Sequence, residues 1–382
     1  MKQPFLASVF CVSLVASTSA AEILTSHADI RFDYLTANGT WDCHVQYGGS
    51  IEEPAVEADP ESVAFPVRDL PSSGAGDRYA QPGSATFSFT GTPAGQPLWI
   101  LPQSDRGYTW PGFDNAQVAG TFLSYQPSDS RTTTAARWWK ISLVSVGYSG
   151  ASSGSPHFSL WTTGAGGAPT VWMATSDGIA STDCYYTTEN SHSHLNWGFT
   201  KLGVYRITLR PSAFLANGSL VENGDHTLTF AVGTLATWRA THFSGPEIVD
   251  EDIGVPLADP DGDGAANLIE YAFNTDPNVP SSAPLTPGSG TSGLPAVLLE
   301  NIGGTDRLTI DFVRRKSASN PQITYHPEFS GDLATGSWVA GQALSVTSID
   351  SNWERVKVVD SQPAGTRRFA RVRIATQAEI SY

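Results

Sequence analysis

The sequence has few charged residues for its length. Asp, Glu, Lys and Arg make up 15% of its 382 residues, against about 25% in typical soluble domains. Chains low in Lys and Glu but rich in Gly, Thr and aromatic residues are typical of β-sheet proteins, because β-branched and aromatic side chains suit a pleated surface. The net charge is −15. We therefore expect no nucleic-acid partner, since such a chain repels phosphate backbones and attracts cations.

Long apolar runs are missing beyond the first residues. Residues 5–15 are apolar, follow Lys2 and precede a tract of small residues. This order is typical of a secretory signal peptide, with cleavage after Ala20 or Ala21; the alternative is a buried N-terminal helix. We expect a signal peptide at residues 1–21, export to the periplasm, cell surface or extracellular space, and no transmembrane segment in the mature chain.

Cysteine is scarce. Of the three cysteines, Cys11 lies in the predicted signal peptide, which leaves Cys43 and Cys184. An even pair in an exported protein favours a disulfide. Closing a loop of 141 residues (184 − 43) stabilises by about 4–5 kcal/mol in the chain-entropy model. Two buried free thiols are the alternative.

Short alternating runs, separated by Gly, Pro, Asn and Ser, dominate residues 22–235. They lie at 30–34, 86–90, 138–146, 157–162, 171–175, 203–210 and 226–232. This spacing predicts a β-sandwich domain.

The character of the chain changes after residue 235. Residues 236–280 read as a connector with a short helical segment at 243–252, capped by Ser244, and a second short helix ending after Phe273. Residues 281–293 are rich in Pro, Ser, Gly and Thr and predict a flexible linker. Further strands follow at 308–314, 322–329, 338–339, 355–359 and 368–374, which predicts a smaller β domain at 294–382. The predicted fold class is all-β, with two β-sandwich-like domains joined by a short helical connector.

The connector contains a calcium-loop pattern at residues 259–270. Every specified position of the EF-hand loop motif is filled. The predicted ligands are Asp259, Asp261, Asp263, the carbonyl of Ala265, Asn267 and Glu270. Calcium prefers about six to eight oxygen ligands, and Gly264 stands where the loop must turn sharply. A single loop without a strong helix before it favours a structural calcium site; an acidic surface turn is the alternative.

A second metal-type pattern lies at His192 and His194. On an extended segment these two side chains face the same side and can share one ion. Zinc needs further ligands, and the candidates are His27 and Asp29, which form another pair two apart, and His157. A hydrogen-bonded histidine pair without a metal is the alternative.

Residues 192–209 resemble the signature of the bacterial surface-anchored domain family, also called choice-of-anchor M domains. The segment reads HSHLNWGFTKLGVYRITL, and the family pattern is H-x-H-x-N-W-x-F-T-x-x-G-x-Y. The similarity extends to HADI at 27–30, LWILPQ at 98–103, W-x-G at 110–112 and HFSLW at 157–161. The resemblance implies an envelope protein that captures or displays a metal, zinc above all, with a metal ABC transporter as partner. Many relatives carry a C-terminal anchor; because no apolar run precedes Tyr382, we expect none here, and the mode of attachment stays open.

The connector is also similar to a known type. Residues 243–277 resemble connectors in exported proteins of Verrucomicrobia and Planctomycetes, and thrombospondin type 3 repeats. The C-terminal β domain is similar to modules that follow this connector. This resemblance implies calcium binding and says nothing about activity.

Catalytic motifs are missing. The sequence has no H-E-x-x-H, G-x-S-x-G, Walker or dinucleotide-binding pattern, and Cys43 and His44 are strand neighbours that face opposite sides. We therefore expect a binding protein with no catalytic residues. A glycan-active hydrolase whose carboxylates the fold brings together is one alternative. The other is a carbohydrate-binding or adhesion protein that recognises cell-surface glycan through exposed tryptophans. The candidates are Trp99, Trp110, Trp138, Trp139, Trp161 and Trp172.

Overall fold

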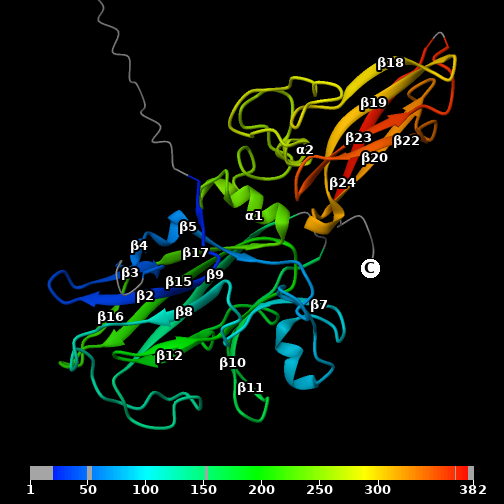
Figure 1. The fold of residues 1–382 in the computed structure, drawn as a ribbon. Helices are drawn as coiled ribbons and strands as arrows, with labels where there is room; N and C mark the ends of the chain where they lie inside the picture. Colours follow the sequence, from blue (N-terminus) through cyan, green and yellow to red (C-terminus); the bar gives the residue numbers. More distant parts are fainter. Residues whose placement is uncertain (1–19, 50–53, 151–153, 366, 377–382) are drawn as a thin grey trace, which may run out of the picture.

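The computed structural model of the chain describes residues 20–49, 54–150, 154–365 and 367–376. The predicted signal peptide lies outside these residues, apart from Ala20 and Ala21. Within the described residues, strands predominate and form five sheets (Figure 1), which confirms the all-β class. No helix in this part of the chain is both long and apolar enough to cross a membrane.

Three of the sheets are built from residues 22–232. The seven-stranded sheet follows the order β1 (Glu22–Ile23), β5 (Val63–Val67), β17 (His226–Val232), β15 (Gly203–Phe214), β9 (Trp138–Ser149) and β12 (Cys184–Thr188), with β16 (Leu220–Glu222) beside β15. A five-stranded sheet follows the order β11 (Pro169–Ala174), β10 (Phe158–Thr163), β14 (Asn196–Phe199), β7 (Pro97–Leu101) and β6 (Arg78–Ala80). The other five-stranded sheet follows the order β13 (His192–His194), β8 (Trp110–Asp114), β2 (His27–Leu35), β3 (Thr40–Tyr47) and β4 (Val56–Ala58).

These three sheets share one hydrophobic core. Phe32 of β2, Trp139 of β9 and Trp197 of β14 all belong to it and are completely buried. Along β2 the burial alternates, so Ala28, Ile30 and Phe32 face the core while the residues between them face outward. The outward-facing residues of β2 include the candidate metal ligands His27 and Asp29.

Helical turns lie between and after these strands. They are the α-helices α1 (Thr234–Ala240) and α2 (Asn267–Phe273) and the 3-10 helices η1 (Pro60–Ser62), η2 (Ala85–Thr90), η3 (Glu247–Val249) and η4 (Ser317–Ser319). The strand predicted at 86–90 is therefore wrong. Ser84 Oγ accepts the N–H of Thr86, and Gly91 ends the helix with a φ of +73°. Local capping overrides the alternating sequence pattern there.

The segment from 236 to 293 is more tightly packed than its composition predicts. At 243–252 only η3 is helical, and the Glu247 carboxylate accepts from both the N–H and the hydroxyl of Ser244. Within 281–293, Leu285 is buried, and its N–H donates to the Leu294 carbonyl over 2.7 Å. The buried Leu285 therefore anchors this Gly- and Ser-rich stretch to the rest of the protein. The composition of the stretch did not predict this contact.

Residues 296–376 form two further sheets. One follows the order β18 (Ala296–Ile302), β19 (Thr305–Arg315), β23 (Trp353–Val359) and β22 (Gln342–Ser348), and the other β21 (Val339–Ala340), β20 (Ile323–Ser330) and β24 (Phe369–Thr376). Their hydrophobic cluster includes Phe312 and Val356, and also Tyr271 and Phe273 of α2. Helix α2 therefore packs on the C-terminal strands through its apolar side chains.

The predicted disulfide between Cys43 and Cys184 does not form. Both thiols are free and buried. Cys43 lies on β3 in one sheet and Cys184 on β12, the last strand of another. The Sγ of Cys184 instead accepts from the Arg131 guanidinium at 3.4 Å. Counting cysteines could not reveal how the fold would place the two thiols, and the structure leaves both unbonded.

Candidate metal centres

Three neighbouring strands bring four of the predicted metal ligands together. Strand β8 lies between β2 and β13 and is parallel to β2 and antiparallel to β13. Asp29 and His194 both pair with Gly112 of β8, from opposite sides. His27 and His192 lie two residues from them along their own strands. Because side chains two apart share a face, all four face outward from the same sheet.

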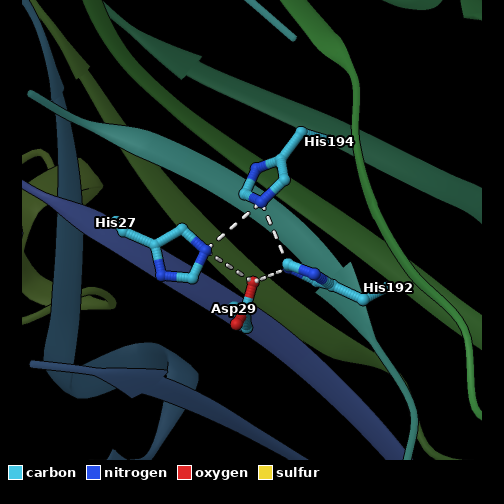
Figure 2. A group of neighbouring side chains, drawn as sticks. All are labelled: His27, Asp29, His192 and His194. Atoms are coloured by element: carbon cyan, nitrogen blue, oxygen red, sulfur yellow. Dashed lines mark hydrogen bonds and ion pairs between the residues drawn. The ribbon is translucent and has the colours of Figure 1, made fainter. Parts of the chain in front are cut away.

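The donor atoms of these four residues form a closed ring of short contacts (Figure 2). Nε2 of His194 lies 3.2 Å from Nε2 of His27 and 3.1 Å from Nε2 of His192. Oδ1 of Asp29 lies 2.8 Å from Nε2 of His192 and 3.3 Å from Nε2 of His27. We call His27, Asp29, His192 and His194 the histidine cluster.

Hydrogen bonds alone cannot satisfy this ring. A neutral imidazole Nε2 either donates one hydrogen or accepts with one lone pair. Three such nitrogens and one carboxylate oxygen can therefore convert at most two of the four contacts into hydrogen bonds. Protonating the rings places N–H groups against each other instead. A central cation that accepts a lone pair from every donor removes the conflict, which is the usual role of such ligands.

The surroundings of the cluster favour an unprotonated His194 and leave His27 and His192 open to solvent. Burial, together with the adjacent His192 and His27 rings, lowers the pKa of His194 to about 4. Neutral imidazole is the form that binds metals. The side chains of His27 and His192 are 45% and 47% exposed, whereas that of Asp29 is 14% exposed. Asp29 is therefore largely covered by the sheet, whereas His27 and His192 are accessible from solvent.

Gly112 makes room for the cluster. A β-carbon on this residue would lie 2.7 Å from Cε1 of His194 and 3.0 Å from Oδ1 of Asp29. Real Cβ atoms essentially never approach other atoms as closely as the first of these distances. A side chain here would push two of the four candidate ligands apart.

Trp110 fixes the orientation of His194. The two rings stack with centroids 3.6 Å apart and an interplanar angle of 11°. The indole Nε1 donates to the Gln103 carbonyl over 3.2 Å, which holds the tryptophan in place. Sequence reasoning did not assign Trp110 and Gly112 to this site, although their spacing of two on a strand indicates that they share one face.

His157 lies apart from the histidine cluster. Its Nδ1 is 3.3 Å from the Thr175 carbonyl, and its ring packs close to Gly91. Its backbone N–H donates to the Thr200 hydroxyl. The cluster therefore draws its ligands from two of the three regions that the sequence suggested.

The acidic loop brings three carboxylates together. Carboxylate oxygens of Asp259, Asp261 and Asp263 lie within 4.8 Å of one another. Backbone N–H groups of the loop orient them: Gly262 and Gly264 donate to Asp259 over 3.1 and 3.0 Å. Gly264 has a φ of +92°, which glycine adopts without strain. The sharp turn predicted at this position is present.

Hydrogen bonds donated by Ala265 and Asn267 hold these two further predicted ligands within the loop. The Ala265 N–H donates to Asp263 over 2.7 Å. The amide nitrogen of Asn267 donates to the carbonyls of Ile253 and Val255 over 2.7 and 2.8 Å. Asn267 therefore ties the start of α2 to the preceding loop through its nitrogen.

Glu270 is buried near Asp261 and Asp263, outside the group that the three aspartates form. It is 1% exposed, and among the described residues its Oε2 has no hydrogen-bond partner, as is also true of Oδ2 of Asp261. Burial, and then the charge of Asp261, raise the pKa of Glu270 to about 7. Buried carboxylates normally have a compensating partner, and a divalent cation is one that would suit this loop.

Most of the tryptophans proposed for glycan stacking are buried. Trp99, Trp139, Trp161 and Trp172 are all at most 9% exposed, so they fill the interior. Trp110 is half-buried against His194.

Cys43 and His44 face opposite sides of their strand, as the strand alternation predicts. Cys43 is buried, whereas His44 turns outward to Asp42 at 3.1 Å.

Among the described residues, the groups of three or more side chains placed to hold a metal are the histidine cluster and the three loop aspartates. No protein-family model matches the chain, and no curated protein matches it significantly. The chemistry of the site therefore rests on the residues of this chain itself.

Proposed function

We propose that the chain is an exported binding protein that captures or displays a divalent transition metal ion through the histidine cluster. Zinc is the ion that the sequence predicts. One observation carries the proposal: three imidazole nitrogens and a carboxylate oxygen form a ring of contacts between 2.8 and 3.3 Å. Imidazole and carboxylate donors of this kind bind first-row divalent metals.

The exposure of the cluster supports capture rather than burial of a permanent ion. His27 and His192 are about half exposed, so an ion held there can exchange with solvent or a partner. The resemblance to surface-anchored domains points to a metal ABC transporter as that partner. Neither catalytic residues nor a substrate are part of this proposal.

We further propose that calcium binds the acidic loop. Asp259, Asp261, Asp263 and Glu270 would supply carboxylates, with the Ala265 carbonyl and Asn267 completing the predicted set. The unpartnered buried oxygens of Asp261 and Glu270 support this assignment. Bound calcium would neutralise the acidic residues at the joint between two β domains, residues 22–235 and 294–382.

Metal analysis of the purified mature chain tests both assignments. After saturation and removal of free ions, elemental analysis is expected to give one transition metal ion and one calcium ion per chain. The double variant His192→Ala/His194→Ala should lose the transition metal and keep calcium. His157→Ala is the matched control and should retain both ions. Equal transition-metal content in the wild type and the double variant would refute capture by the histidine cluster.

A further inference from the structure

We infer that the histidine cluster holds its ion in a square, tetragonal arrangement, with Asp29 opposite His194 and His27 opposite His192. Such a site selects Cu²⁺ or Ni²⁺ over Zn²⁺. This inference rests on the proposed function and deepens it, because it names the class of ion.

The separations of the donor atoms distinguish a square from a tetrahedron. Zinc at about 2.0–2.1 Å from four tetrahedral donors keeps all six donor pairs about 3.4 Å apart. A square with the same bond lengths has four pairs about 2.9 Å apart and two diagonal pairs about 4.1 Å apart. The two arrangements therefore differ most in their diagonals.

The histidine cluster has the pattern of a square. Its four neighbouring contacts are 2.8, 3.1, 3.2 and 3.3 Å. Asp29 forms ion pairs within 4.0 Å with His27 and His192, but within the described residues it forms none with His194. All four ligand atoms still lie within 4.8 Å of one another. The Asp29–His194 separation is thus a diagonal, and it is too long for a regular tetrahedron.

The second diagonal shows the same trend. The rings of His27 and His192 have centroids 5.7 Å apart, whereas His27–His194 and His192–His194 are 5.0 and 4.8 Å apart. In Figure 2, His27 and His192 lie on opposite sides of the ring, and His194 and Asp29 occupy the other two sides.

Strand register produces this arrangement. Asp29 and His194 flank Gly112 directly, one from each neighbouring strand. His27 pairs with Trp110 and His192 pairs with Asp114, so these two lie diagonally across Gly112. Four ligands that stand around one glycine on a sheet surface spread in a plane over it. The fifth coordination position then faces outward, where His27 and His192 are about half exposed.

Tetragonal sites with nitrogen and oxygen donors are characteristic of Cu²⁺ and Ni²⁺. Cu²⁺ binds more tightly than Zn²⁺ at almost any such site, because affinity generally rises along the first-row series to copper. Nickel is therefore the informative competitor, since a tetrahedral site favours Zn²⁺ and a square one favours Ni²⁺.

The test is competition between Ni²⁺ and Zn²⁺ on the full mature chain, followed by electron paramagnetic resonance of the Cu²⁺-loaded protein. At equal concentrations, Ni²⁺ is expected to displace most of the bound Zn²⁺, and Cu²⁺ should give an axial spectrum with splitting from three nitrogens. Retention of Zn²⁺ against Ni²⁺ would overturn the inference. If the chain binds none of the three ions, the proposed function itself fails, and the two failures are thereby distinguished.

The substitution Gly112→Ala provides a second, independent test of the planar site. The new methyl group would enter the plane between Asp29 and His194, so affinity for Ni²⁺ should fall by about 10–100-fold, the loss typical when ligand positions are disturbed. Gly147→Ala is the matched control on β9, because a β-carbon there would meet only Arg206 at an ordinary 3.7 Å. Unchanged Ni²⁺ affinity in Gly112→Ala would contradict a planar site over this glycine.

Discussion

The histidine cluster and the acidic loop are two candidate metal centres built in opposite ways. The cluster joins residues 27–29 to residues 192–194 through strand register. The loop gathers its three aspartates within five consecutive residues. The first is positioned by sheets with a shared core, and the second by its own turns.

This difference predicts different behaviour without metal. The histidine cluster contains one carboxylate among three imidazoles, so the ion-free cluster carries little charge repulsion. The acidic loop gathers three carboxylates, and the buried Glu270 lies near enough to feel the charge of Asp261. Their mutual repulsion opposes folding, and a bound cation would relieve it. Metal should therefore stabilise the loop more than the cluster.

The largest expected effect is the loss of transition-metal binding in His194→Ala. His194 contacts both other histidines of the cluster, so its removal opens the ring. We expect affinity to fall by more than the roughly 10–100-fold typical of outer-shell changes, measured by isothermal titration. Calcium binding should be unchanged. A tight transition-metal site that survives this substitution would place the ion elsewhere.

Calcium removal should have the next largest effect. With free calcium at about 100 times its Kd, binding stabilises the folded chain by about 2.7 kcal/mol. Chelation should lower the melting temperature and expose the region of residues 250–280 to proteases, while strands β2 and β8 stay protected. Mass spectrometry of the fragments locates the cuts. Identical cleavage with and without calcium would show that the acidic loop is stable alone.

Glu270→Gln should act in opposite directions with and without calcium. Above the raised pKa of Glu270, about 7, the amide keeps the size of the side chain but removes one charge near Asp261. In chelator, we expect the variant to be more stable than the wild type by about 1 kcal/mol, a common size for single substitutions. In calcium, the order should reverse, because a ligand charge is lost. Denaturant melts in both conditions reveal the crossover, and the same order in both would argue against Glu270 as a ligand.

The smallest expected effect comes from Trp110→Leu. Stacking between aromatic rings contributes about 0.5–1.5 kcal/mol, which corresponds to about a 2- to 13-fold weaker metal affinity. Trp138→Leu is the control, because Trp138 is also half-buried but lies on β9, away from the cluster. Equal losses in both variants would mean that Trp110 acts only through general stability.

The sequence named all four residues of the histidine cluster but not how they meet, whereas the three aspartates of the acidic loop are neighbours in the chain. The aspartates and Gly264 obey a local motif, so spacing alone identified them. His27 and Asp29 were found as a second pair two apart, but nothing in the chain shows that β8 would place Gly112 between them and His194. Register between distant strands depends on tertiary packing, and the same limit explains the disulfide that does not form.

A crystal structure of the metal-soaked protein, with anomalous scattering measured at the metal absorption edge, tests the central claim most directly. We predict one anomalous peak about 2.0–2.2 Å from Nε2 of His27, His192 and His194 and from Oδ1 of Asp29. A fully occupied peak at another position, or no peak at this cluster under saturating metal, would contradict the account.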